Sequence, residues 1–196
     1  MEMRQADPSA PRVRLFVALA LPADARRAIA TSLGGALSGM NSLRLLDADS
    51  LHVTLAFLGS RAQADVEELA DVVKQATVGF GAATLSPRGL AALPPHRPHV
   101  LALDLDDEGG RAAAVQSAVS DSLVAAELHE PERRPFRPHV TVARVRRGAK
   151  QRSWQLPRLH AEPFVAGEVV LYRSDLRPDG ARYVPLARAT LAEEGA

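Results

Sequence analysis

Hydrophobic positions along the chain follow two periods, one typical of strands and the other typical of helices. An apolar stretch over 13–20 predicts a first strand. Apolar side chains then recur at every fourth position from Ala25 to Leu37, and Pro22 suits a first helical position, so a helix is predicted over 22–38. The same reasoning predicts helices over 64–78 and 111–128 and strands over 41–46, 51–58, 84–93, 99–105, 139–145, 164–172 and 183–191.

The order of strands and helices repeats in the second half of the chain. Strands that alternate with helices indicate an α+β fold, and the repetition indicates two similar lobes. Residues 1–12 contain two prolines and no periodic apolar pattern, so we expect a disordered tail there. Residues 13–196 are predicted to form a single bilobal domain, because their number suits one compact unit.

One short motif occurs in a strand of each half. Residues 52–56 read His-Val-Thr-Leu-Ala and residues 139–143 read His-Val-Thr-Val-Ala, 87 residues further along the chain. Side chains alternate between the two faces of a strand, so the His, Thr and Ala of each motif are predicted to share one face. On this alternation Phe57 lies on the other face of the first strand and packs in the core.

Two imidazoles, each followed by a hydroxyl two residues later, can flank a small anion from opposite sides. Attack on a phosphate diester needs one group to take a proton and another to supply one, and two histidines can do both near neutral pH. We therefore predict His52 and His139 as catalytic residues and Thr54 and Thr141 as phosphate-binding residues. A single His-Val-Thr strand is usually an ordinary half-buried strand; the prediction depends on the two copies occurring together.

Composition narrows the possible chemistry. The chain has no cysteine, which excludes thiolate catalysis and cysteine-ligated metals, and this arrangement of side chains requires no metal or other cofactor. The net charge is +1, but basic residues gather around the second motif, where they either attract an anionic substrate or form a solvated face. These residues are Arg133, Arg134, Arg137, Arg144, Arg146, Arg147, Lys150 and Arg152.

Apolar runs are too short for a membrane span of about 18–20 residues. The run over 15–21 follows two arginines, as in a signal peptide, but it ends at a proline and fits a first core strand better. We therefore expect a cytoplasmic protein that does not associate with membranes, and we expect it to be a monomer.

Five segments together resemble the 2H phosphoesterase superfamily, and within it the RNA 2′,3′-cyclic phosphodiesterase branch, long called the 2′-5′ RNA ligase family. They are 14–22 (RLFVALALP), 51–59 (LHVTLAFLG), 134–144 (RPFRPHVTVAR), 171–174 (LYRS) and 180–183 (GARY). The fold that this resemblance implies is two pseudo-symmetric α+β lobes, each an antiparallel sheet with flanking helices, around a central cleft that carries one motif per lobe.

The resemblance also implies a reaction. RNA 2′,3′-cyclic phosphate ends would be hydrolysed to 2′-phosphomonoesters, with reversible 2′-5′ RNA ligation as a further activity. We assign His139 as the base for water and His52 as the acid for the departing 3′ oxygen, roles that exchange in the ligating direction. Two alternatives stay open: a phosphodiesterase acting on small nucleotide cyclic phosphates or 2′-5′ oligoadenylates, and a non-catalytic protein that binds RNA ends.

Three residues near the second motif are candidate substrate contacts: Phe136, Arg137 and Arg144. Phe136 can pack in the core or stack on a base. By strand alternation Arg144 lies on the face opposite His139, so it reaches the phosphate only if the strand ends or twists there; otherwise it is structural. His96 and His99 lie in a proline-rich connection without acidic partners, which favours loop or substrate-contacting roles over metal binding.

The chain departs from the family in its aromatic residues. Family members often carry tryptophan before the first motif and in the hairpin, where this chain has Leu45-Leu46 and Ala102. Base stacking is therefore expected to be weaker or to come from other residues. The single tryptophan, Trp154, is expected to anchor the packing of the lobes.

Overall fold

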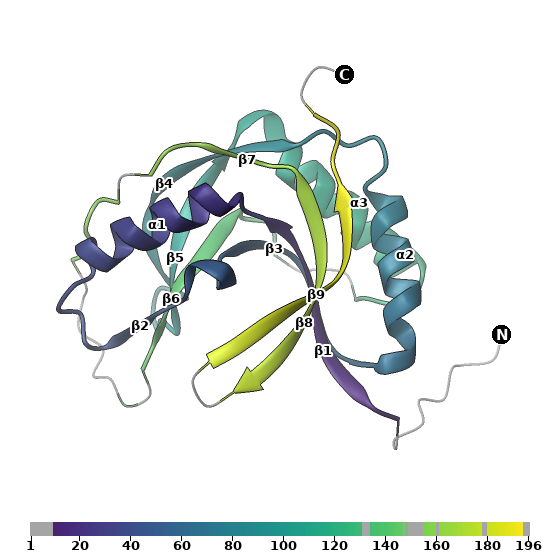
Figure 1. Ribbon diagram of the computed structural model, residues 1–196, viewed down its shortest axis with the longest axis horizontal. Coiled ribbons are helices and arrows are strands. Elements are labelled where there is room, and N and C mark those ends of the chain that lie inside the picture. The colour runs from purple at the N-terminus through teal and green to yellow at the C-terminus, as the bar shows by residue number, and fades with distance from the viewer. Residues whose placement is uncertain are drawn as a thin grey trace.

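Nine strands form one curled antiparallel sheet in the computed structural model, which describes residues 10–130, 134–146, 148, 155–159, 161–177 and 180–193 (Figure 1). The strands are β1 (Arg12–Ala20), β2 (Leu43–Leu45), β3 (His52–Ala62), β4 (Ala83–Leu93), β5 (Val100–Asp107), β6 (His139–Val145), β7 (Phe164–Ala166), β8 (Glu168–Arg177) and β9 (Gly180–Thr190). Their order is β7-β4-β5-β6-β3-β1-β8-β9, and β2 also pairs with β6. The predicted α+β fold with antiparallel pairing is confirmed.

The sheet has two halves that meet between β3 and β6. Val53 and Val140 form the one residue pair between these two strands. Strands β1, β8 and β9 continue the sheet on the β3 side, whereas β5, β4 and β7 continue it on the β6 side. The two expected lobes are therefore halves of one continuous sheet, and each half contributes one His-containing strand to the junction.

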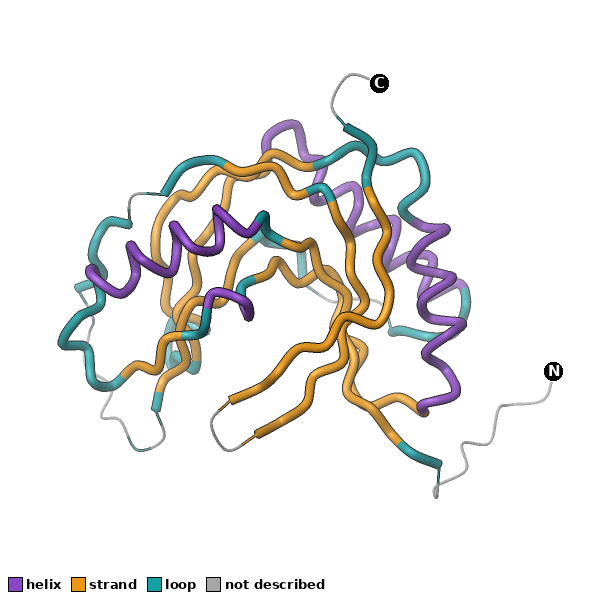
Figure 2. The backbone as a smooth tube through the Cα atoms, viewed as in Figure 1, coloured by secondary structure: helices purple, strands orange, loops and turns teal. Residues whose placement is uncertain are grey.

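Helices cover the sheet in two places. The helices are α1 (Ala23–Ala36), α2 (Val66–Ala76) and α3 (Arg111–Ala125), with 3-10 turns η1 (Ala48–Ser50), η2 (Gln63–Asp65) and η3 (Glu108–Gly110). Helices α2 and α3 pack against each other, while α1 lies apart from them and contacts η1 (Figure 2). In the described part of the chain, no helix combines the length and apolar character needed to cross a bilayer.

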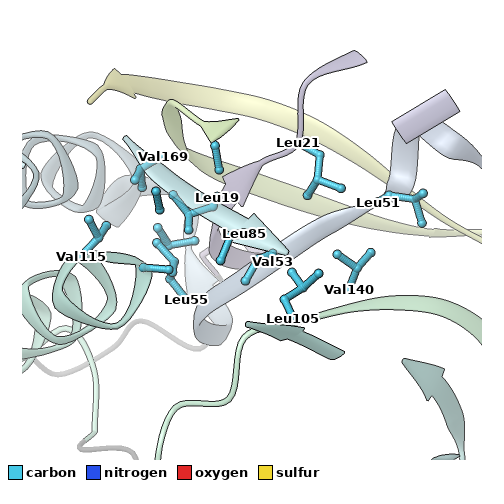
Figure 3. Close-up of a cluster of buried hydrophobic side chains, with 14 of the residues drawn as sticks. Leu19, Leu21, Leu51, Val53, Leu55, Leu85, Leu105, Val115, Val140 and Val169 are labelled. Carbon is cyan, nitrogen blue, oxygen red and sulfur yellow. The ribbon is translucent and has the colours of Figure 1, made fainter. Parts of the chain in front are cut away.

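The core lies between the sheet and these helices. Val53 and Val140 are fully buried, and the apolar residues around them, including Leu19, Leu85 and Val115, come from both halves and from α3 (Figure 3). Burying one such side chain stabilises the fold by about 1.5–3 kcal/mol. Because both valines face this core, the neighbouring residues at 52, 54, 139 and 141 lie on the opposite face of the sheet.

Most predicted elements are confirmed within a few residues, and the predicted strand over 139–145 coincides with β6. The single strand predicted over 164–172 is wrong, because the chain passes at Gly167 from one half of the sheet to the other. Before Gly167, β7 pairs with β4, and after it β8 pairs with β1. Both pieces are apolar, so the hydrophobic pattern carried no sign of the change of partner.

Strand β1 begins one residue earlier than predicted. The Arg12 guanidinium donates hydrogen bonds to the Ser60 hydroxyl at 3.0 Å and to its carbonyl oxygen at 2.7 Å, which anchors the start of β1 to β3. Pro11 of the predicted tail is also held in place, because its carbonyl oxygen accepts a hydrogen bond from the Gln63 N–H at 2.8 Å. Residues 1–9 lie outside the described residues, so their disorder stays a prediction.

Candidate active site

The two His-Val-Thr motifs lie side by side at the junction of the sheet. In an antiparallel pair, residues on either side of a matched pair oppose each other in reverse order. The Val53–Val140 pair therefore brings His52 toward Thr141 and Thr54 toward His139. All four polar side chains are partly exposed on the face opposite the core.

Two adjoining cavities open over this face. One has a volume of about 420 Å³ and is lined by His52, Thr54 and Thr141, among others. The other, of about 710 Å³, is lined by Thr54 and His139. Thr54 borders both cavities, so a group held at its hydroxyl lies between the two histidines.

A bulge follows the motif in β3 and changes which residues face the cleft. The register against β1 skips Leu55, so Leu55 and Ala56 are both buried and the alternation is reset. Phe57 consequently turns to the cleft, where it is 47% exposed and borders both cavities. The predictions that Ala56 shares a face with His52 and that Phe57 packs in the core are wrong for this reason.

The same irregularity follows the motif in β6. The register against β5 skips Val142, and Ala143 is fully buried, so the expected position of Ala143 beside His139 is also wrong. Arg144 is exposed and lines the 420 Å³ cavity together with His52. The bulge supplies the reorientation that an unbroken strand would not, so Arg144 lies at the cleft. Its contact with the phosphate stays a prediction.

His52 lies in an aromatic enclosure. Its ring centroid is 4.7 Å from that of Phe16, 5.1 Å from Tyr183 and 6.2 Å from Tyr172. Its Nδ1 lies 2.8 Å from the Ser50 carbonyl oxygen. A carbonyl only accepts, so Nδ1 carries the proton and Nε2 is left for a substrate.

This enclosure shifts the titration of His52. Burial lowers the pKa of His52 from 6.5 to about 4, against the opposing effect of the Ser50 carbonyl; the nearby His139 and Arg144 lower it further. Burial also raises the pKa of the neighbouring Tyr172. With this pKa His52 is neutral near pH 7 in the folded chain.

His139 has the same backbone anchor in a different setting. Its Nδ1 lies 2.8 Å from the Arg137 carbonyl oxygen, so its Nε2 is also left for a substrate. Asp104 on β5 is its partner in the register, and the Arg137 guanidinium forms an ion pair with Asp104. One histidine thus lies among aromatic rings and the other beside an ion pair.

The other residues considered in the sequence lie either at the larger cavity or away from both cavities. Phe136 packs against the core and also lines the larger cavity, which Arg137 and His99 border as well. His96 lies exposed in the connection between β4 and β5, and Trp154 lies outside the described residues. Across the described ranges, no group of three or more His, Asp or Glu side chains is placed to hold a metal ion.

Sequence reasoning missed the residues that enclose His52. Phe16, Tyr172 and Tyr183 belong to the segments that carry the family resemblance, but no spacing along the chain connected them with His52. Their role follows from pairing: β1 lies between β3 and β8, and β9 lies beyond β8. The resemblance of the segments was the one signal available.

Comparisons with known proteins agree with this geometry. Residues 41–177 match the family model described as the 2′-5′ RNA ligase superfamily. An Archaeoglobus fulgidus protein named RNA 2′,3′-cyclic phosphodiesterase is 28% identical over 89% of this chain and 98% of its own length. Proteins of the same name from Aeropyrum pernix and Geobacillus stearothermophilus are 28% and 27% identical, and the matches cover 58% and 53% of their lengths.

A likeness in three dimensions extends over nearly the whole chain. The crystal structure of E. coli LigT superposes with a TM-score of 0.76 at 25% identity, covering 93% of this chain and 99% of LigT. LigT has also been crystallised with ATP, in a structure that matches with a TM-score of 0.69 at 25% identity. The paired motifs and the matched family model lead to the same conclusion: the chain belongs to the 2′-5′ RNA ligase superfamily of 2H phosphoesterases.

Proposed function

We propose that this protein hydrolyses RNA 2′,3′-cyclic phosphate ends to 2′-phosphomonoesters. The observation that carries the proposal is the position of four side chains, His52, Thr54, His139 and Thr141, on one face of two adjacent antiparallel strands. The name shared by the three bacterial and archaeal relatives supports the substrate class.

Each group has a defined part in the proposed reaction. The hydroxyls of Thr54 and Thr141 donate hydrogen bonds to the non-bridging phosphate oxygens and hold the phosphorus between the two imidazoles. Water attacks phosphorus and loses a proton to the Nε2 of one histidine. The P–O3′ bond breaks, and the Nε2 of the other histidine protonates the departing 3′ oxygen.

The order expected from the sequence, His139 as base and His52 as acid, requires a protonated His52. Because burial lowers the pKa of His52 to about 4, the fold by itself does not supply this state near pH 7. An anionic phosphate beside the ring favours the charged imidazolium and raises that pKa. We therefore propose that substrate binding itself protonates His52, so that the acid forms only when a phosphate is present.

An assay on a cyclic-ended RNA tests the function. In the presence of a chelator, the wild type should convert the end to a 2′-phosphate, and H52A or H139A should lose about 10²–10⁴-fold in kcat. Arg88→Gln is a matched control because Arg88 is exposed and pairs with Asp106 on the outer hairpin of β4 and β5. Activity that disappears with chelator and returns with zinc would contradict the proposal, and a 3′-phosphate product would contradict the leaving-group assignment.

The larger cavity favours 2′-5′ ligation as a second activity. It borders His139, has apolar walls that include Phe136 and Val100, and offers Gln116 as a polar group. A nucleoside 5′-hydroxyl bound there would take the place of water, and its proton would pass to the same base. Starting from the cyclic phosphate, the two histidines therefore keep the roles that they have in hydrolysis, and the exchange expected from the sequence does not apply to this step. Joining a cyclic-ended RNA to a 5′-hydroxyl RNA should yield a linkage resistant to a nuclease specific for 3′-5′ bonds. Hydrolysis without any joined product at high RNA concentration would exclude this activity.

A further inference from the structure

A carboxylate lies beside His139 on the cleft face of the sheet. Asp104 of β5 is the direct register partner of His139, and the residues on either side of it, Leu103 and Leu105, are buried in the core. Strand alternation therefore places Asp104 on the same face as His139, and directly opposed side chains have Cβ atoms about 4.5–5.5 Å apart. The Asp104 side chain is only 19% exposed. A partly desolvated negative charge thus lies next to one of the two imidazoles.

One residue binds both the carboxylate and the imidazole. The Arg137 guanidinium donates a hydrogen bond to Oδ2 of Asp104. The backbone carbonyl of the same residue accepts the hydrogen bond from Nδ1 of His139 at 2.8 Å. The guanidinium–carboxylate contact therefore fixes the residue whose carbonyl holds the His139 ring with Nε2 toward the cleft.

The segment before β6 is also fixed to β5 through its backbone. The Leu105 N–H donates a hydrogen bond to the Pro138 carbonyl oxygen at 3.1 Å. The second oxygen of Asp104, Oδ1, is buried and has no hydrogen-bond partner among the described residues. Buried polar atoms without a partner are uncommon and call for an explanation. This oxygen is an acceptor held in reserve beside a histidine.

Asp104 is the carboxylate that strand pairing brings to His139. The described residues that line the larger cavity with His139 include no carboxylate. The titratable or charged groups of the described chain that surround His139 are Asp104 from β5, His52 from β3, Arg134 and Arg137 from the segment before β6, and His99 from the connection before β5. An opposite charge at this range favours the charged form of an imidazole. Unless a cation offsets it, Asp104 would therefore hold His139 as imidazolium, which accepts no proton from water.

We propose that Asp104 and Arg137 form a positioning pair for His139. Arg137 offsets the charge of Asp104, which keeps His139 available as the base, and Asp104 in turn anchors Arg137 so that its carbonyl fixes the His139 ring. Neither residue takes or gives a proton in the reaction, and both act through the imidazole. This inference rests on the proposed function, in which His139 is the base for water.

The pH profile of kcat/KM separates this role from a merely structural one. Arg137→Gln leaves the carboxylate without its cation, so the acidic limb, where the base gains a proton, should move up by about one pH unit. Asp104→Asn removes the carboxylate, so the limb should not move up, while kcat should fall about tenfold because Arg137 loses its anchor. The double variant R137Q/D104N should behave as Asp104→Asn does. Arg137→Lys should leave the limb in place, because an ammonium also offsets the carboxylate.

Arg88→Gln is the matched control. Arg88 forms the same kind of ion pair with Asp106, two residues further along β5, and Asp106 lies beyond the last residue that β5 pairs with β6. Its pH profile should coincide with that of the wild type. Thermal unfolding of each variant checks that it is folded.

Kinetic results can overturn the inference in two ways. A raised KM with unchanged kcat and an unmoved limb in Arg137→Gln would make Arg137 a substrate contact instead of a positioning residue. A limb raised as far in R137Q/D104N as in Arg137→Gln would show that the Asp104 carboxylate is not the charge that Arg137 offsets.

NMR of the His139 ring tests the inference without turnover. The titration midpoint of its ring protons should be higher in Arg137→Gln than in the wild type, and this increase should be absent from R137Q/D104N. A wild type that hydrolyses no cyclic phosphate but shows these midpoints would refute the proposed function and leave the pair in place. An active wild type whose midpoint is the same in Arg137→Gln would overturn the pair and leave the function in place.

Discussion

The aromatic enclosure of His52 should make the stability of the fold depend on pH. The pKa of His52 is lowered to about 4, whereas a histidine in the unfolded chain titrates near 6.5. Between these values the unfolded chain binds a proton that the folded chain does not, so stability falls as pH decreases and is fully present above about 6.5. Proton linkage with these two pKa values gives a loss of about 2 kcal/mol between pH 7 and pH 5, approaching about 3 kcal/mol near pH 4.

Urea unfolding at a series of pH values measures this contribution. Carboxylates also titrate in acid, so the informative quantity is the difference between the wild type and His52→Asn, which removes the imidazole. From pH 7 to pH 5 the wild type should lose about 2 kcal/mol more than His52→Asn. His96→Asn is the control, because it removes an exposed loop histidine and leaves the surroundings of His52 intact.

Two results would refute this reasoning. If His52→Asn lost as much stability in acid as the wild type, burial would not be depressing the His52 pKa in the folded chain. If the wild type gained stability as the pH fell toward 5, the imidazolium would be favoured by folding, and the sign of the argument would be reversed.

Three further predictions concern the cleft and its support. Inorganic phosphate should raise the pKa of His52, which NMR of its ring protons measures. An unchanged pKa would exclude protonation of His52 by the substrate, and it would make His52 the base and His139 the acid. Thr54→Val should lower kcat/KM about 10–100-fold with little change in Tm, because it removes one hydrogen bond to the phosphate; unchanged kinetics would remove Thr54 from the site. Gly180→Ala should destabilise the fold by about 1 kcal/mol or displace Arg44, because Gly180 has a φ of 142° and an added Cβ would lie 2.6 Å from the Arg44 guanidinium. An unaltered urea midpoint together with unaltered chemical shifts at Arg44 would contradict this contact.

Part of the candidate site follows from local periodicity. His52 and Thr54 share a face because two residues complete one period of a strand, and His139 and Thr141 do so for the same reason. That statement needs no knowledge of the partner strands. The valines between them, 53 and 140, identify the opposite face as the one that is buried, as the structure confirms.

The arrangement beyond these motifs depends on pairing between distant segments. The bulge after Thr54 is a feature of the pairing of β3 with β1, and the bulge after Thr141 is a feature of the pairing of β6 with β5. These bulges turn Phe57 and Arg144 toward the cleft. The change of partner at Gly167 likewise separates two apolar segments that look alike in sequence. Strand alternation, which is a local rule, could predict none of these events.

The sequence by itself determined which side chains the proposed chemistry uses: two imidazoles and two hydroxyls in matching positions on two strands, with the segments that carry the family resemblance. Only the tertiary structure decided how the two histidines differ, because the rings of Phe16, Tyr172 and Tyr183 reach His52 through three neighbouring strands. Desolvation depends on which atoms surround a group in space. A pKa and a cleft lining are therefore properties of the packed fold, whereas the identity of a proton-transfer group is a property of the chain.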